Sequence, residues 1–124
     1  MDMYREEILD HYKHPHNLGH LDKPDAMVEE GNVTCGDRIV MEIAVDKKKI
    51  VDIKFSGEGC AISQASASML TDKVKGMKLS KAMDLKTNDI IAMLGTSLTP
   101  SRTKCALLPL EVLTKAIWKI STQK

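Results

Sequence analysis

The chain has 124 residues, a net charge of +1 and an ordinary apolar content of 43%. This length suits one globular domain, residues 1–124, with a modest core. The balanced charge argues against nucleic acid or a membrane surface as a partner, and no apolar run is long enough to span a bilayer. The N-terminus has no apolar signal core, and three cysteines is an odd number for a secreted disulfide framework. We therefore expect a soluble, cytoplasmic protein.

The N-terminal third of the chain predicts a helix, a loop and a short strand. Tyr4 to Lys13 carries apolar residues at helical spacing, and Pro15 stops the pattern. Turn-forming residues then fill a loop over 14–26. Met27 to Asn32 is predicted to form the first short strand.

Residues 38–45 and 50–55 predict an antiparallel hairpin, because apolar and polar side chains alternate in both. The turn between them, 46–49, contains three lysines and is interpreted as a solvated loop rather than a binding patch. The residues expected to face the core are Ile39, Met41, Ile43, Val45, Val51, Ile53 and Phe55.

Helices dominate the rest of the chain. Three are predicted at Ala61 to Lys75, Ser80 to Met83 and Asn88 to Leu94. Gly76 and Gly95 are suited to end the first and the third, and Thr87 or Asn88 is expected to cap the third.

The last helix shows a core-facing stripe of Leu107, Leu110, Leu113, Ile117 and Ile120. Leu98 to Arg102 is predicted to be a loop. The helix would begin near Thr103 or, because proline fits best in the first turn, near Leu108, just before Pro109. Trp118 lies off the stripe and is expected to be exposed. Together the elements indicate an α+β fold, a three-stranded antiparallel sheet packed on one face by about five helices.

Cys60 lies where a strand-like run ends and a helix of small residues begins. Gly57 and Gly59 precede it, which suggests close approach of the backbone. A thiol at a helix N-terminus is favoured as the thiolate by the helix dipole. A small buried residue at a helix start is an equally good interpretation of Cys60 taken alone.

The two other cysteines also have unusual surroundings. In Cys35-Gly36-Asp37 the glycine permits a tight turn that can present thiol and carboxylate on one side, although such a triplet alone is more often structural. Cys105 follows Arg102 and Lys104, which favour its thiolate. It would lie on a mobile leader or at a weak point of the last helix.

Three thiols and the Asp37 carboxylate supply four ligands. Zinc accepts such a set, and iron–sulfur clusters are held mainly by thiolates. A carboxylate is a harder ligand to cluster iron than a thiolate, so a cluster held here would be labile, as a cluster donor requires. The four histidines, His11, His14, His16 and His20, have no acidic partner at ligand spacing, so structural or solvent-facing roles are favoured for them.

Four segments together resemble the IscU and NifU N-terminal family of iron–sulfur cluster assembly proteins, over nearly the whole chain. They are His11-Tyr12 with Pro15, Asn17 and Gly19; Asn32 with Cys35-Gly36-Asp37, where Val33 replaces the usual proline; Phe55 and Gly57 to Ser63 with Ala65 to Ser68; and Cys105 with Leu108.

The resemblance implies a scaffold, not an enzyme, that builds a [2Fe–2S] cluster from iron and sulfur on Cys35, Asp37, Cys60 and Cys105. It implies a cysteine desulfurase as the donor of persulfide sulfur and apo-proteins as clients. Cys105 is the acceptor we favour, with Lys104 as a candidate to support its thiolate. The scaffold would be a monomer or a homodimer bridged by the cluster.

A second branch of the family is the alternative. Scaffolds usually have histidine where Lys104 stands, and their chaperone-binding loop reads differently from Leu98 to Arg102 here. Arg102 to Cys105 instead resembles SufU, which holds zinc at the same four ligands and acts as a sulfurtransferase. The segment 76–105 is, however, too short to contain the insertion found in SufU.

Overall fold

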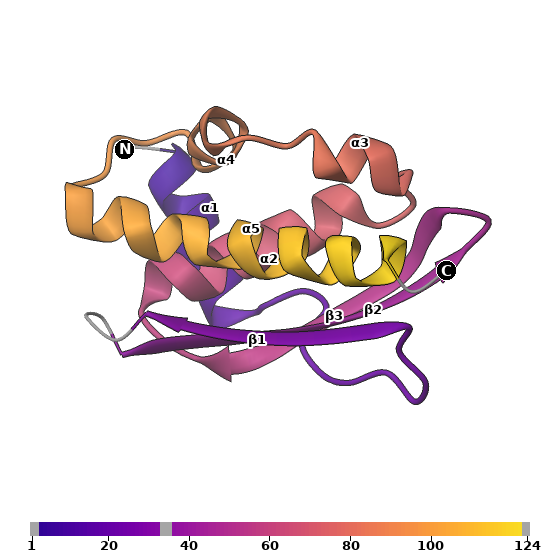
Figure 1. Ribbon diagram of the computed structural model, residues 1–124. Helices are drawn as coiled ribbons and strands as arrows, with labels where there is room; N and C mark the ends of the chain where they lie inside the picture. Colours follow the sequence, from indigo (N-terminus) through magenta and orange to yellow (C-terminus); the bar gives the residue numbers. More distant parts are fainter. Residues whose placement is uncertain (1–2, 33–35, 123–124) are drawn as a thin grey trace.

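The computed structural model describes residues 3–32 and 36–122 (Figure 1). Its elements in chain order are α1 (Met3–Lys13), β1 (Ala26–Asn32), β2 (Asp37–Asp46), β3 (Lys49–Glu58), α2 (Ala61–Val74), α3 (Leu79–Met83), α4 (Thr87–Leu94) and α5 (Pro100–Ser121). The predicted α+β class, with an antiparallel sheet in the order β1-β2-β3 and five helices, is confirmed. Within the described ranges, no helix has the length and hydropathy needed to cross a bilayer.

The helices form a layer over one face of the sheet (Figure 1). α5 packs along β1 and β2, α2 packs against α5 and β3, and α1 lies against α2. This arrangement brings the start of β2, the N-terminus of α2 and the first turns of α5 to the same end of the molecule (Figure 1).

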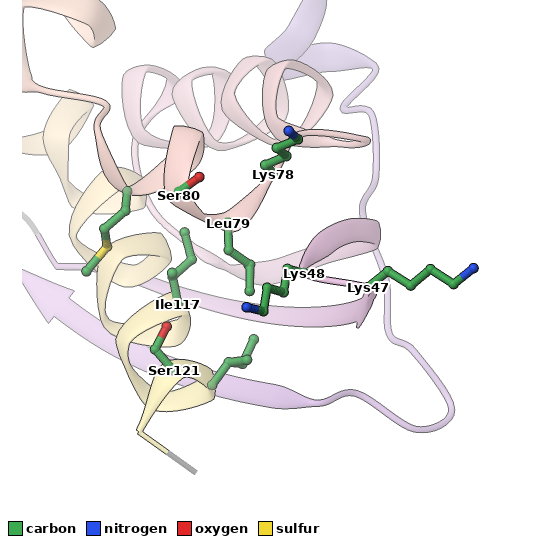
Figure 2. Close-up of a pocket in the computed structure, with 9 residues that line it drawn as sticks. Lys47, Lys48, Lys78, Leu79, Ser80, Ile117 and Ser121 are labelled. Atoms are coloured by element: carbon green, nitrogen blue, oxygen red, sulfur yellow. The ribbon is translucent and has the colours of Figure 1, made fainter. Parts of the chain in front are cut away.

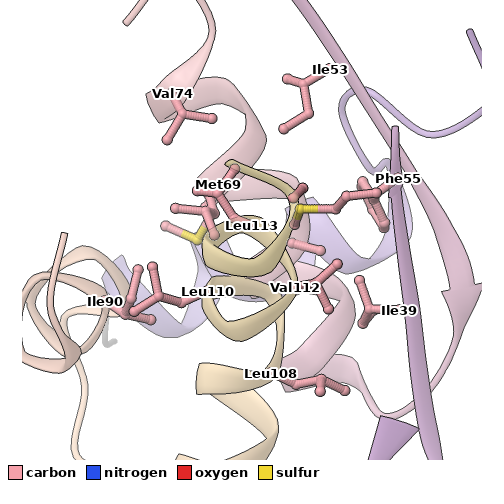
Figure 3. Packing of buried hydrophobic residues seen from close by; sticks show 14 of the residues in the cluster. Ile39, Ile53, Phe55, Met69, Val74, Ile90, Leu108, Leu110, Val112 and Leu113 are labelled. Carbon is pink, nitrogen blue, oxygen red and sulfur yellow. The ribbon is translucent and has the colours of Figure 1, made fainter. Parts of the chain in front are cut away.

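The core lies between the sheet and the two long helices (Figure 3). Ile39, Ile53 and Phe55 project from the sheet toward Leu113 on α5 and Met69 on α2, and all five are buried. A large apolar side chain buried in this way contributes about 1.5–3 kcal/mol to folding. The helical layer is therefore held to the sheet along its length.

The expectation that Val51 faces the core is wrong, because a bulge interrupts the hairpin. Ala44 pairs with Asp52 but Val45 pairs with Ile50, which leaves Val51 as an extra residue on β3. A bulge shifts the alternation of side chains by one position. Val51 is consequently 52% exposed and Ile50 fully buried.

The loop between α1 and β1 covers the outer edge of β3 and part of the opposite face of the sheet. The Gly19 N–H donates to the Phe55 carbonyl at 2.9 Å. On β2, the buried Glu42 accepts hydrogen bonds from the Leu21 N–H at 3.1 Å and contacts His20 Nδ1 at 2.6 Å. The loop thus closes an edge that would otherwise be open to other strands.

The predicted starts of two helices are corrected. α5 begins at Pro100 rather than at Thr103 or Leu108, because the Thr99 hydroxyl caps it by accepting from the Arg102 N–H at 3.3 Å. Proline is well suited to that first helical position, so the expected loop at Leu98 to Arg102 is already helical from Pro100. Similarly, α4 is capped at Lys86, whose N–H donates to the Asp89 carboxylate, rather than at Thr87 or Asn88. Trp118 is exposed, as expected.

Candidate metal centre

Asp37 is the first residue of β2 and lies buried, with 2% of its surface exposed. Gly36 before it has a φ of 70°, the left-handed conformation that the turn into β2 requires. The Asp37 carboxylate accepts a hydrogen bond from the Cys60 N–H at 2.9 Å. Cys35, the predicted ligand that precedes this turn, lies outside the described residues.

Two glycines let the end of β3 come this close to Asp37. Gly57 has a φ of 125°, and a Cβ there would lie 2.0 Å from the Arg38 carbonyl oxygen. A Cβ on Gly59 would lie 2.5 Å from both the Asp37 Oδ1 and the Ser63 hydroxyl. The close approach of the backbone that the sequence predicted is confirmed at both positions.

Cys60 is the N-cap of α2, as its position in the sequence predicted. Its Sγ lies 3.8 Å from Asp37 Oδ2 and 3.9 Å from the Ser63 hydroxyl. Burial raises the pKa of the Cys60 thiol, and the Asp37 carboxylate raises it too. Hydrogen bonds from the Ser63 backbone and hydroxyl and from Cys105 outweigh these effects and bring the pKa below its ordinary value. The thiolate is therefore favoured at Cys60.

Cys105 reaches the same place from α5. It is 2% exposed and lies inside the regular helix, so the expected leader segment is not observed. The Ser66 hydroxyl on α2 donates to the Ala106 carbonyl at 2.7 Å, which ties the two helices together here. Pro109 has no N–H to offer the carbonyl of Cys105, so the helix lacks that one hydrogen bond.

The metal-binding atoms of Asp37, Cys60 and Cys105 all lie within 4.8 Å of one another. In the described part of the chain, no lysine, arginine or histidine pairs with the Asp37 carboxylate, although a buried charge is costly without a partner. Two thiols and a buried carboxylate in this arrangement suit a zinc ion or the iron of a cluster.

Lys104 precedes Cys105 on α5, and its side chain is exposed. Among the residues that the structure describes, its ammonium group has no hydrogen-bond or ion-pair partner. Arg102 is exposed on the same turn. Both residues therefore add positive charge to the exposed surface of the first turns of α5.

The four histidines differ in their exposure and in their hydrogen-bond partners, which the sequence did not indicate. His14 is exposed, whereas His20 contacts the buried Glu42. His11 is buried and shares a hydrogen bond of 2.7 Å with the Ser68 hydroxyl, and His16 is hydrogen-bonded to Asp72. The sequence missed these acidic partners because they come from distant segments, Asp72 on α2 and Glu42 on β2.

A cavity of about 560 Å³ lies at the opposite end of α5 (Figure 2). Leu79, Met83, Ile117 and Ile120 provide apolar walls, with two serines and three lysines around them. Lys48 points toward Ser121, whereas Lys47 extends away (Figure 2). Among the described residues that line it there is no cysteine, histidine or carboxylate, so they offer neither a metal ligand nor a nucleophilic thiol.

Comparison with known proteins shows the family of this chain. The model of the NifU-like N terminal domain family matches residues 3–124. The zinc-dependent sulfurtransferase SufU of Bacillus subtilis is 39% identical over 134 aligned residues, which cover 94% of this chain and 90% of SufU. The iron-sulfur cluster assembly scaffold protein IscU of Haemophilus influenzae is 38% identical over 118 residues, 92% of each chain.

Solved structures agree on the fold. The N-terminal part of a NifU-like protein from Brucella abortus superimposes with a TM-score of 0.79 at 20% identity, covering 98% of this chain and 96% of that one. The family match extends over all five helices and all three strands. This protein therefore belongs to the NifU-like N terminal domain family.

Proposed function

We propose that this protein is a cytoplasmic scaffold for iron–sulfur cluster assembly. Its cargo is a labile [2Fe–2S] cluster, held by Cys35, Asp37, Cys60 and Cys105 and passed on to apo-proteins. The observation that carries the proposal is the convergence of three of these ligands within 4.8 Å from three separate elements. Relatives named as cluster assembly scaffolds support it.

Sulfur arrives as a persulfide from a cysteine desulfurase. The Cys105 thiolate attacks the outer sulfur, the desulfurase S–S bond breaks, and the desulfurase thiolate leaves. Arg102 and Lys104 favour the attacking thiolate. Because Cys105 is buried, the first turns of α5 must open, and the backbone bond missing at Pro109 eases that opening.

The acceptor is tested by incubating single Cys→Ser variants with a desulfurase and cysteine, then measuring the added sulfur by mass spectrometry. Loss of the persulfide in Cys105→Ser but not in Cys60→Ser is expected. The reverse result would transfer the role to Cys60, which is more exposed and has the lowered pKa.

Asp37 has the role of keeping the cluster exchangeable. Its oxygen is a harder ligand than thiolate and is already engaged by the Cys60 N–H. Asp37→Ala should therefore change the lifetime of an assembled cluster while leaving all three thiols in place.

The scaffold function is tested by anaerobic reconstitution with desulfurase, cysteine, ferrous iron and a dithiol reductant, which supplies electrons to convert persulfide sulfur to sulfide. Visible charge-transfer absorption, acid-labile sulfide and transfer to an apo-ferredoxin are expected. Failure to form an absorbing cluster would overturn the proposal. Size exclusion before and after reconstitution distinguishes a monomer from a cluster-bridged homodimer.

A zinc-dependent sulfurtransferase that activates the desulfurase is the second candidate, favoured by the 39% identity to SufU. The same ligands fit zinc, which would hold the thiols until the desulfurase binds. Against it, the alignment with SufU of Bacillus subtilis is longer than the 124-residue chain, so that relative has residues that this chain lacks. Stoichiometric zinc in a colourless protein, with desulfurase turnover that depends on Cys105, would favour this candidate.

A further inference from the structure

A second group of metal-binding side chains lies outside the cysteine site. His11 on α1, His16 on the loop that follows and Asp72 on α2 have ligand atoms within 4.8 Å of one another. The centroids of the two imidazole rings are 4.5 Å apart. The end of α1 with its following loop and the distant helix α2 therefore bring two imidazoles and a carboxylate close together.

Neighbouring groups orient these side chains. The Ser68 hydroxyl lies 2.7 Å from His11 Nδ1, which fixes the ring and leaves Nε2 as the nitrogen that an ion can take. The Asn17 amide donates to Asp72 Oδ1 at 2.8 Å, so Oδ2 is the oxygen that faces His16. Burial raises the pKa of Asp72, but the hydrogen bonds from His16 and Asn17 outweigh burial and bring the pKa below its ordinary value. The carboxylate is therefore kept ionised.

The surroundings are open to small ions. His11 and Asp72 line a hollow of about 330 Å³, together with Glu7, Lys73 and two methionines. The Glu7 carboxylate balances the Lys73 ammonium, so the Asp72 charge leaves the hollow with a net negative charge. The side chains of His16 and Asp72 are nearly half exposed and can adjust to an ion, whereas His11 is buried and fixed.

We propose that His11, His16 and Asp72 form a second metal site, for a divalent first-row transition ion such as Zn²⁺ or Fe²⁺. Two imidazoles and one carboxylate are a donor set that such ions accept, with remaining positions open to water. Asp72 lies roughly 18 Å along α2 from Cys60, at 1.5 Å per residue, so this site is separate from the cysteine site. A bound ion would clamp α1 and its loop onto α2.

The test is an anaerobic titration of the full chain with Co²⁺, followed by its absorption spectrum. Thiolate ligands give near-ultraviolet charge-transfer bands, and the histidine site should add a second equivalent with only weak visible bands. In His16→Arg that second equivalent should disappear, although an arginine can still pair with Asp72. His14→Arg, a change of an exposed histidine in the same loop, is the matched control and should bind two equivalents.

Two further variants keep the test decisive. Ser68→Ala should weaken the second equivalent about tenfold or more, since it removes the group that orients His11. Cys60→Ser should weaken the charge-transfer bands of the cysteine site and leave the second equivalent intact. A failure of the cysteine site is thereby distinguished from a failure of the histidine site. A wild-type protein without a second equivalent, or His16→Arg with undiminished binding, would overturn the proposal.

Discussion

The two ends of α2 carry two groups of potential metal ligands that are built in different ways. At the Cys60 end, Asp37 and Cys105 are buried, and the backbone must pass so close to them that Gly57 and Gly59 cannot carry a Cβ. At the Asp72 end, two helix positions and a loop in which Asn17 adopts a left-handed conformation bring the side chains together, and those of His16 and Asp72 are nearly half exposed. The buried site therefore requires glycines where a Cβ would collide with its neighbours, whereas a Cβ on Gly19, in the loop of the half-exposed site, would meet nothing within 4 Å.

The largest effect on stability is expected from a change in the core that supports both ends of α2. Phe55→Ala should lower the free energy of unfolding by about 3–5 kcal/mol, because the ring is fully buried between the sheet and α2. Urea unfolding measures this loss. Val51→Ala on the same strand is the control, and its exposed side chain should cost less than about 0.5 kcal/mol. Equal losses in the two variants would contradict the bulge at Val51.

Gly57→Ala should damage the Cys60 end first. The new Cβ would collide with the Arg38 carbonyl, and the positive φ adds strain, so a loss of at least about 1–3 kcal/mol is expected. Gly76→Ala is the matched control, since its φ of 87° is also positive but its Cβ would meet nothing within 4 Å. Thermal melts measure the loss of stability in both variants. If the two losses are equal, the need for glycine at position 57 comes from its positive φ alone and not from the close approach to Arg38.

Gly59→Ala is expected to disturb the cysteine site while leaving the fold intact. Its Cβ would push against the Asp37 carboxylate and the Ser63 hydroxyl, which displaces a ligand without a strained backbone. The lifetime of a reconstituted cluster should change by about tenfold, as for other groups that orient metal ligands. Binding of Co²⁺ at the histidine end should stay the same. A cluster with the lifetime of the wild type would show that Asp37 is not held as described.

The smallest effect is expected from Lys104→Ala. The side chain is exposed, so stability should change by less than about 0.5 kcal/mol. The rate of sulfur acceptance should fall by no more than about fivefold, because an exposed charge contributes at most about 1 kcal/mol. Lys104→Arg should restore the rate. A rate loss that arginine cannot restore would require a role for the lysine ammonium other than its charge.

Local patterns in the sequence predicted most of the fold correctly. The hairpin, the helix that begins after Cys60 and the glycine that ends α4 depend on alternation, capping and backbone freedom, which act over a few neighbouring residues. The bulge at Val51 and the start of α5 at Pro100 were missed. At each position the local sequence allows two arrangements, and the packing of the folded chain decides between them.

The sequence by itself predicted that three thiols and Asp37 form one site, because each lies beside a glycine, a proline or basic residues that an inert cysteine does not need. The structure describes three of these four residues and brings Asp37, Cys60 and Cys105 together. Only the tertiary structure decided that Cys105 is buried within a regular helix and that His16 meets Asp72. The physical reason is distance along the chain. Turn and capping preferences act between neighbours, whereas the docking of α1 and α5 onto α2 follows from the burial of whole apolar faces.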